Sequence, residues 1–342
     1  MKRRTFLTSS LALTGTAFSL GTSSPLVAGP LTPGGGEKPE EHITAYVVDS
    51  KPEMTYEAWI RRNNVSLTSY RAFKHQKYPY FFPVAGPVSG LSLTTETSLP
   101  WPHHRSVFFG CDKVNGGNYW QGTLRDGQIV SQGVSLGEVT ETSCRIKDRC
   151  LWGKPLKPLS AGESPEPDII EDTRLFELKL LEGTVNYVID ADITMKALVD
   201  VKVERTNHGL YGVRVSPELA PDGGGNLVNS NGKRGQKETE GKPANWMAYY
   251  GRRSGLKEEI VEGIAVMIHP RHPDTEAFPT FKNCPWFTRD YGNCSPMPMN
   301  FMSDPLTLPK GESIRLKYRI VAFAGTPENA RLDALWEDFA ST

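Results

Sequence analysis

The sequence lacks three features that would narrow its function at once: an excess of charge, a long hydrophobic run and a paired-cysteine motif. Basic and acidic residues number 39 each, so no net electrostatic field selects nucleic acid or an anionic membrane surface. Beyond the N-terminal region, no stretch approaches the roughly 20 consecutive apolar residues that cross a bilayer. We therefore expect no nucleic-acid partner and no transmembrane segment in the mature chain.

Cysteine is also scarce. Five cysteines occur in 342 residues, and none has the C-x-x-C spacing that is typical of a zinc site. Two pairs, Cys144 with Cys150 and Cys284 with Cys294, are close enough in sequence to close small loops, which leaves Cys111 unpaired. We expect these pairs to be structural disulfides, and we predict neither a metal site nor a cofactor.

The N-terminal residues have the composition of an export signal. Arg3 and Arg4 are followed by a short, weakly apolar run and then by small residues. This order is typical of a secretory leader, and the arginine pair favours the twin-arginine route. The sequence therefore predicts a Tat-type signal peptide over 1–28, a disordered spacer over 29–42 and a single domain over 43–342, in a periplasmic or secreted protein.

Short runs of alternating apolar and polar residues dominate the rest of the chain. Such alternation is what a half-buried β-strand requires, and Gly, Pro, Asn and Asp clusters separate the runs. The predicted fold class is all-β, a large antiparallel β-sandwich. One short C-terminal helix is expected over 330–339, because Thr326 and Pro327 suit a helix start and apolar residues follow at helical spacing. The clearest alternating runs are 106–109, 174–180, 185–190 and 313–321.

Aromatic and charged residues gather in a few segments that suit a ligand site. These segments are 100–106, 114–120, 209–219 with the loop 226–235, and 263–270 leading to 285–292. The residues that we consider for proton transfer are His104, His269, Asp290 and Glu218. The residues that we consider for ligand binding are His103, Arg105, Trp120, Arg214, Asn229, Arg289 and Tyr291.

Each of these residue types suits sugar chemistry, but each also has a structural alternative. A neutral imidazole accepts or donates a proton, arginine grips a carboxylate or a hydroxyl pair, and aromatic faces suit the C–H faces of sugar rings. The alternatives are a hydrogen-bonded core histidine, a solvated Glu218, a glycine turn before a buried strand, and a structural Arg289–Asp290 pair. Because adjacent strand residues point to opposite faces, His103 and His104 can share a site only if they precede the strand.

Taken in order, these segments resemble the bacterial methane oxygenase PmoA-like family of unknown function. The resemblance implies a galactose-mutarotase-like super-sandwich and a part in carbohydrate metabolism. It does not imply a methane monooxygenase subunit, which is an integral membrane protein. Two residues depart from the family pattern: Trp101 replaces the first histidine of H-P-H-H-R, and Phe287 replaces the histidine of W-H-x-R-D-Y-G. The matching blocks are Tyr78–Pro87, Trp101–Ser106, Val114–Trp120, Val213–Leu219, Asn229–Gly232, Trp246–Gly251, His269-Pro270 and Trp286–Gly292.

The leading hypothesis is an exported carbohydrate-active protein that acts on a glycoside or modified sugar by acid/base chemistry. In this hypothesis His104 or His269 donates a proton, Glu218 or Asp290 accepts one, and arginines hold ring oxygens. The alternative is a non-catalytic carbohydrate-binding protein, and a third possibility is a structural envelope protein without a pocket. Convergence of an acid and a base on one site would separate the first hypothesis from the others.

Overall fold

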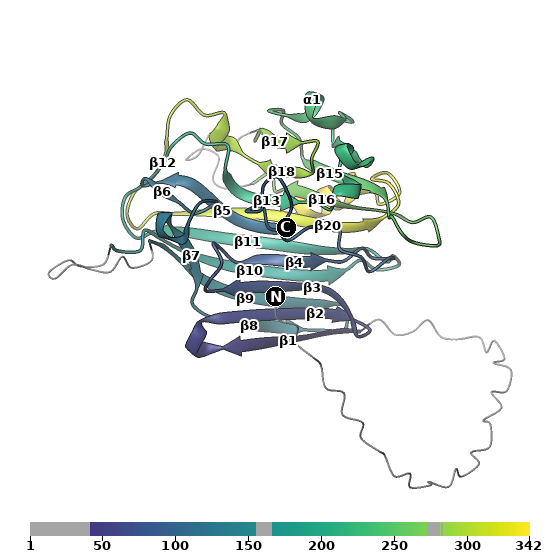
Figure 1. Cartoon of the computed structure of the whole chain (residues 1–342), viewed down its shortest axis with the longest axis horizontal. Coiled ribbons are helices and arrows are strands. Elements are labelled where there is room, and N and C mark those ends of the chain that lie inside the picture. The colour runs from purple at the N-terminus through teal and green to yellow at the C-terminus, as the bar shows by residue number, and fades with distance from the viewer. Residues whose placement is uncertain (1–41, 155–165, 272–280, 282) are drawn as a thin grey trace, which may run out of the picture. The chain divides into compact units, whose positions relative to one another are not determined.

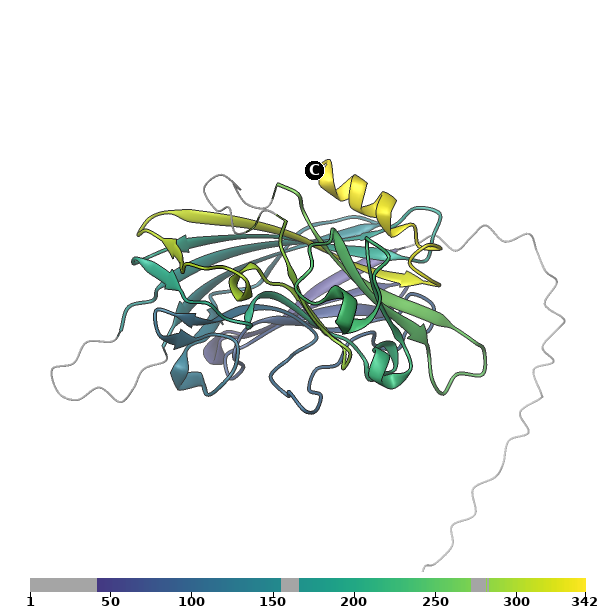
Figure 2. The same cartoon turned by 90° about the horizontal axis from the view of Figure 1, so that it is seen from above.

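The computed structural model describes residues 42–154, 166–271, 281 and 283–342, which form two stacked antiparallel sheets (Figure 1). Residues 41–342 make up one compact unit. Figure 2 shows the two sheets as layers seen from above, with the C-terminal helix on the outer side of one of them. The predicted signal peptide, and all but the last residue of the predicted spacer, lie outside the described residues.

The first sheet has eleven strands within the described part of the chain. Residues distant in sequence meet in it, because β5 pairs with β13 and β13 with β18. Off the main path, β6 (Gly117–Asn118) pairs with β5, while β12 (Val201–Val203) pairs with β5 and with β19 (Leu306–Leu308). The main path runs in spatial order through β1 (Ile43–Ser50), β2 (Thr55–Arg62), β3 (Val65–Phe73), β4 (Tyr80–Val84), β5 (Val107–Val114), β13 (Gly209–Arg214), β18 (Asn293–Pro296) and β17 (Trp286–Arg289).

The second sheet has nine strands by the same count. Its central strands are the longest, and they contain the alternating runs 174–180 and 313–321 in full and 187–190 of a third run. Off its main path, β8 (Ser135–Val139) pairs with β9. The main path runs through β14 (Asn226–Asn229), β15 (Trp246–Arg252), β16 (Val261–Ile268), β20 (Ser313–Ala324), β11 (Tyr187–Ala197), β10 (Ile170–Leu180), β9 (Ser143–Gly153) and β7 (Gln128–Ser131).

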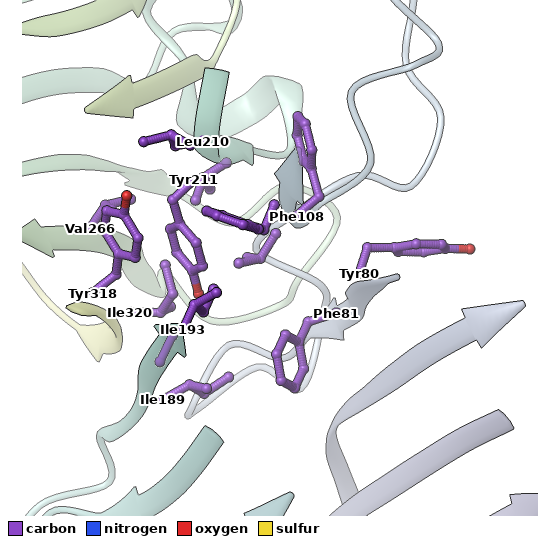
Figure 3. Packing of buried hydrophobic residues seen from close by; sticks show 14 of the residues in the cluster. Tyr80, Phe81, Phe108, Ile189, Ile193, Leu210, Tyr211, Val266, Tyr318 and Ile320 are labelled. Carbon is purple, nitrogen blue, oxygen red and sulfur yellow. The ribbon is translucent and has the colours of Figure 1, made fainter. Parts of the chain in front are cut away.

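The main hydrophobic core lies between the two sheets. Tyr211 of β13 stacks on Tyr318 of β20 with ring centroids 4.4 Å apart, and Phe81 of β4 meets Phe176 of β10 edge-on at 4.8 Å. Figure 3 shows Tyr211, Tyr318 and Phe81 among the aliphatic side chains of this core. Along β10 every second residue is buried, as the alternating sequence predicts. The predicted all-β antiparallel sandwich is therefore confirmed.

The C-terminal helix, α2 (Leu332–Ala340), covers part of the outer face of the second sheet. Leu332 and Phe339 are buried in a smaller cluster with residues of β15, β16 and β20, so the apolar stripe serves packing as expected. The predicted helix start at Thr326 and Pro327 is wrong: Arg331 is the N-cap and the helix begins at Leu332. Thr326 and Asn329 instead close a separate turn through their side chains. A second, five-residue helix, α1 (Gly235–Thr239), was not predicted. Neither of these helices has the length and apolar character needed to cross a membrane.

The expected disulfides are wrong. All five cysteines are buried free thiols. Cys144 and Cys150 lie on the same extended strand, β9, where six residues at about 3.3 Å each separate them far beyond disulfide reach. Both face the core, where the Cys150 thiol donates to Asp148 Oδ2 at 3.2 Å.

Candidate functional site

The outer face of the first sheet carries a row of polar and aromatic side chains. Strand register places Arg71 of β3 opposite Tyr80 of β4, Tyr80 opposite Phe108 of β5, and Phe108 opposite Gly212 of β13. Phe81 faces the core, and side chains alternate along a strand, so the row faces outward. Figure 3 shows Tyr80 and Phe81 leaving β4 in different directions.

A loop over residues 95–106, here called the histidine loop, begins and ends beside β13. The Thr95 amide donates to the carbonyl of Arg214 (3.1 Å), and the Arg214 amide donates to the carbonyl of Ser106 (2.7 Å). Ser106 also donates its amide to Thr95, which closes the base of the loop at 2.8 Å. These backbone bonds place the loop over the end of β13 that carries Arg214.

His103 and His104 lie in this loop, ahead of β5, and therefore share one site. Their rings meet edge-on with centroids 4.4 Å apart, and the ring of His104 also lies 6.4 Å from that of Tyr291. Burial lowers the pKa of His104 to about 2 and that of His103 to about 4, so both rings are neutral at physiological pH. His103 Nε2 and His104 Nδ1 are buried without a hydrogen-bond partner among the described residues.

Trp120 joins the histidines from the bend after β6. Its ring packs edge-on against Phe108 at 4.6 Å and lies 6.1 Å from His104. A Cβ atom at Gly212 would stand 2.6 Å from Phe108 Cζ and 3.0 Å from Trp120 Cη2, so the glycine lets both rings rest on the backbone of β13. The bend is held by Asn118, whose Oδ1 accepts the Trp120 amide at 3.0 Å. The Trp120 Nε1 atom is buried without a partner in the described structure.

Arg214 supplies the positive charge of the site. It is 2% exposed, and its guanidinium lies 4.5 Å from the centre of the Tyr291 ring. One nitrogen, Nη2, donates to Leu99 O (3.0 Å) and Ser98 Oγ (3.3 Å) in the histidine loop. Burial lowers the pKa of Arg214. As predicted, Arg214 faces away from the core that Tyr211 enters.

Sequence reasoning missed His208, which stands directly before β13. Its Nδ1 lies 3.1 Å from Asp112 Oδ2, and its ring is 6.3 Å from His103 and 5.9 Å from Trp120. Asp112 is in turn held by the hydroxyl of Thr206. The available signal was a histidine just ahead of a strand, the same setting that drew attention to His103. We call His103, His104, Trp120, His208, Arg214 and Tyr291 the outer-face cluster.

Glu218, a predicted proton acceptor, belongs to a different network. Its Oε1 pairs with Arg253 Nη1 at 2.9 Å, and its Oε2 accepts the Ser254 amide at 2.8 Å. Arg253 also lies 3.4 Å from Glu262, whose buried carboxylate accepts the amide of Val88 at 2.7 Å. Glu218 is thus paired with Arg253 and is not part of the outer-face cluster. Through Arg253 it helps to anchor the segment that leads into the histidine loop.

His269 lies elsewhere as well. It follows β16, meets Phe339 of α2 edge-on at 5.1 Å, and accepts the Arg271 amide on Nδ1 at 3.0 Å. Burial lowers its pKa to about 4. It lines a separate pocket of about 450 Å³ together with Asn245 and Trp336. The structure therefore does not bring His269 together with His104.

Three further candidates, Arg289, Asp290 and Asn229, lie outside the outer-face cluster. Arg289 does not pair with Asp290; its Nη1 lies 2.9 Å from Glu240 Oε2. Asp290 accepts the Gln236 amide at 2.8 Å and so holds the start of α1. Asn229 uses its side-chain oxygen to accept two amides of its own turn. These three residues have structural contacts and stand apart from the histidines.

Arg105 flanks the cluster on the β4 side. Its guanidinium lies 5.6 Å from the centre of the Tyr80 ring, and Nη1 is 3.4 Å from Thr97 Oγ1. The Tyr80 hydroxyl donates to Glu96 at 2.6 Å, and Arg71 reaches the same carboxylate at 2.8 Å. The polar outer face thus continues from the cluster across β4 and β3.

No group of three or more His, Cys, Asp or Glu side chains within the described ranges is arranged to hold a metal ion. The outer-face cluster supplies the neutral imidazoles of His103 and His104, the imidazole of His208, one guanidinium and aromatic rings. Such groups bind oxygen-rich organic molecules through hydrogen bonds and ring contacts. The chemistry open to them is proton transfer and hydrogen bonding.

The fold and the cluster together define a class of protein: an antiparallel β-sandwich with a histidine- and arginine-bearing site on the outer face of one sheet. Within this class the chain belongs to a family of unknown function, DUF6807, whose model matches residues 57–337. The matched range contains every residue of the outer-face cluster. No curated protein sequence matches the chain.

The solved structures with a similar chain path include proteins whose names denote sugar-processing enzymes. A glycoside hydrolase family 36 α-galactosidase from Geobacillus stearothermophilus aligns with a TM-score of 0.41 at 10% identity, over 81% of this chain and 40% of that enzyme. A protein described as an aldose 1-epimerase from Klebsiella pneumoniae aligns with a TM-score of 0.38 at 9% identity, over 88% of both chains. An α-galactosidase from Lactobacillus brevis aligns with a TM-score of 0.33 at 8% identity, over 82% of this chain and 39% of that one. This chain spans less than half of either α-galactosidase.

Proposed function

We propose that this protein binds a sugar or a sugar-derived molecule at the outer-face cluster and acts on it by acid/base chemistry. The observation that carries the proposal is the set of buried polar atoms in the cluster that have no partner among the described residues. These atoms are His103 Nε2, His104 Nδ1, Trp120 Nε1, and Arg214 Nε and Nη1. Buried polar groups in folded proteins are nearly always hydrogen-bonded, so such a concentration of unpartnered atoms indicates a place for a ligand or its ordered water.

A sugar matches the cluster in both of its chemical aspects. Trp101, which is 46% exposed, lies 6.0 Å from His103, and Tyr291 is half-buried beside His104. Aromatic rings of this kind cover the C–H faces of a pyranose, while imidazole nitrogens take its hydroxyl groups. Trp101 replaces a histidine of the PmoA-like pattern, so in this chain an exposed indole takes a place that elsewhere has an imidazole.

In the proposed mechanism His208 is the proton acceptor. Asp112 holds the Nδ1–H group of His208, which leaves the lone pair on Nε2 as the basic site. His103 and His104 stay neutral and bind hydroxyl groups, because their low pKa values keep protons off these rings. This arrangement assigns binding, and not proton donation, to His104.

The finer parts of the proposal follow from the sequence. We propose a periplasmic or secreted protein that leaves the cytoplasm through the twin-arginine route, on the basis of the leader-like residues 1–28. We also propose a relationship to the PmoA-like proteins, on the basis of the ordered blocks. On the same basis we propose that the protein takes part in carbohydrate metabolism.

The proposal is tested by exposing the purified protein to a panel of neutral glycosides, uronic acids and oxidised sugars, followed by NMR. We expect at least one compound to bind and to be converted. The His208→Gln variant should lower the rate about 10²–10⁴-fold, the usual effect of losing a general base, with binding largely retained. Asp112→Asn should produce a smaller loss in the same direction.

The control variant is His75→Gln, an exposed histidine on the loop after β3. It should leave both binding and conversion unchanged. Binding without conversion across the panel would favour the non-catalytic carbohydrate-binding protein. No binding to any sugar would contradict the proposal as a whole.

A further inference from the structure

Four arginine side chains in the described structure are buried, and three of them pair with carboxylates. Arg174 pairs with Asp172 at 2.7 Å, Arg319 pairs with two carboxylates, and Arg253 lies between Glu218 and Glu262. Burying a cation costs several kcal/mol unless an anion and hydrogen bonds compensate it, which explains these pairs. Arg214 is the exception, because no carboxylate among the described residues pairs with it.

The donors of Arg214 are also incompletely used. Only Nη2 makes hydrogen bonds, to Leu99 O and Ser98 Oγ, while Nε and Nη1 are buried without partners in the described part of the chain. The contact with the Tyr291 ring offers weak compensation compared with an ion pair. Arg214 therefore keeps both a charge and donors that the protein itself does not satisfy.

A second unsatisfied group stands beside it. Asn293 of β18 is the register partner of Arg214, and its side chain is fully buried. Both its Oδ1 and its Nδ2 lack partners within the described residues. Directly opposed residues on one face of an antiparallel pair have Cβ atoms about 5 Å apart, so the guanidinium and the amide can donate to the same ligand group.

We propose that Arg214 and Asn293 hold an anionic group of the sugar ligand, so that the ligand class is acidic sugars that carry a carboxylate or a sulfate. This inference rests on the proposed function, because it concerns the ligand of the same cluster. A guanidinium forms charge-assisted hydrogen bonds with planar carboxylates and with sulfates, and a side-chain amide adds a neutral donor. The anion supplies the counter-charge that Asp172 supplies to Arg174.

The anion reaches the guanidinium only after a covering group moves. The Tyr291 ring lies on the guanidinium, and the Ser98–Leu99 segment is bound to Nη2. Leu99 is 83% exposed, and Trp101 is also exposed, so this part of the histidine loop has few packing contacts to lose. Binding should therefore shift the loop and replace the Leu99 contact.

Calorimetric titration with three matched ligands tests the inference: glucuronate, glucose 6-sulfate and methyl glucoside. The wild-type protein should bind at least one anion about tenfold or more tightly than the neutral glucoside, and the preferred anion identifies the group. Arg214→Gln should abolish this preference, so that its affinity for each anion falls to its affinity for the neutral glucoside. Arg214→Lys should retain part of it, because it keeps the charge but loses the planar donors.

Stability measurements separate this role from a structural one. Arg214→Gln should leave the urea midpoint unchanged or raise it, because no protein carboxylate is left unpaired, whereas Arg174→Gln should lower the midpoint by stranding Asp172. Equal affinity for charged and neutral sugars, or an anion preference that survives Arg214→Gln, would overturn the inference while the proposed function stands. Failure of all three ligands and of the wider sugar panel would instead contradict the proposed function.

Discussion

At the scale of single residues, the site contains polar groups that are buried and therefore make no hydrogen bonds to bulk water. His104 is 3% exposed and its neighbours include His103 and Arg214, which act together with burial to disfavour a proton on its ring. In the unfolded chain the same imidazole has its ordinary pKa near 6.5. Burial of this neutral histidine therefore lowers the free energy of unfolding only when the pH falls, because the unfolded chain then binds a proton.

This difference gives a prediction about acid sensitivity. The folded pKa of His104, about 2, lies below the unfolded value, so between about pH 6.5 and pH 2 the unfolded state binds a proton that the folded state does not. Stability should fall as the pH falls through this window, by up to about 1.4 kcal/mol per pH unit for this one group. His104→Gln should lose less free energy of unfolding than wild type between pH 7 and pH 5, measured in urea.

An independent readout is the NMR signal of the His104 ring, assigned by its disappearance in the same variant. Its chemical shift should stay constant from pH 8 to pH 4. A ring that titrates near pH 6.5, together with identical pH dependence in the two proteins, would show that His104 is not desolvated as the structure describes.

At the scale of elements, the histidine loop is positioned by contacts that originate far along the chain. The fully buried carboxylate of Glu262, at the start of β16, accepts the amides of Val88 and Ser89 at 2.7 and 2.9 Å. Arg253 ties Glu262 to Glu218 and donates to Ser92 O at 2.9 Å. The second sheet thus fixes the segment that leads into the loop of the first.

Glu262→Gln tests this anchor. Removing the negative charge leaves Glu218 as the one carboxylate that pairs with buried Arg253 among the described residues. Losing one member of a buried ion pair typically costs about 3–5 kcal/mol. The matched control is Glu259→Gln, because Glu259 pairs with Arg252 where both side chains are more than half exposed. That exposed pair should contribute less than about 1 kcal/mol. Equal losses in the two variants, measured by urea unfolding, would mean that Glu262 does not anchor the segment.

At the scale of the whole molecule, the sandwich is held by its core and not by covalent links. Both large sheets contribute aromatic and aliphatic side chains to one cluster, which also contains all five cysteines. Burial raises the pKa of each thiol, so the reactive thiolate form is disfavoured in the folded protein.

The thermal midpoint should therefore be the same with and without a thiol reductant. A colorimetric thiol reagent should detect none of the five thiols rapidly in the folded protein and all five after denaturation. A midpoint that falls on reduction, with fewer than five thiols in the denatured chain, would restore the disulfides that sequence spacing suggested.

Several features that depend on local interactions were predicted correctly from the sequence. Alternation along 174–180 and 313–321 predicted strands correctly, and it placed Arg214 on the face opposite Tyr211, because side-chain alternation is a local property of extended backbone. The stripe on 330–339 likewise predicted a packed helix. Each of these features is decided within about ten residues.

The membership of the site was not predictable in the same way. Because β5 pairs with β13, His104 lies near Arg214 and Trp120 lies against Gly212. His208 joins them through Asp112. Glu218 pairs with Arg253 instead, a partner that the sequence did not indicate. The partner of a charged side chain is the opposite charge that lies nearest in the folded protein. Spacing along the sequence says little about that distance.

The sequence by itself determined the alternation of buried and exposed side chains, the antiparallel β class and the residue types available for chemistry, because these depend on local backbone geometry and composition. Only the tertiary structure decided which histidines meet, which carboxylates are already paired, and which arginine lacks a counter-charge. The physical reason is that strand order brings together segments separated by a hundred residues or more, and burial then makes each unpaired polar group costly. That cost is what distinguishes the outer-face cluster from the rest of the polar surface.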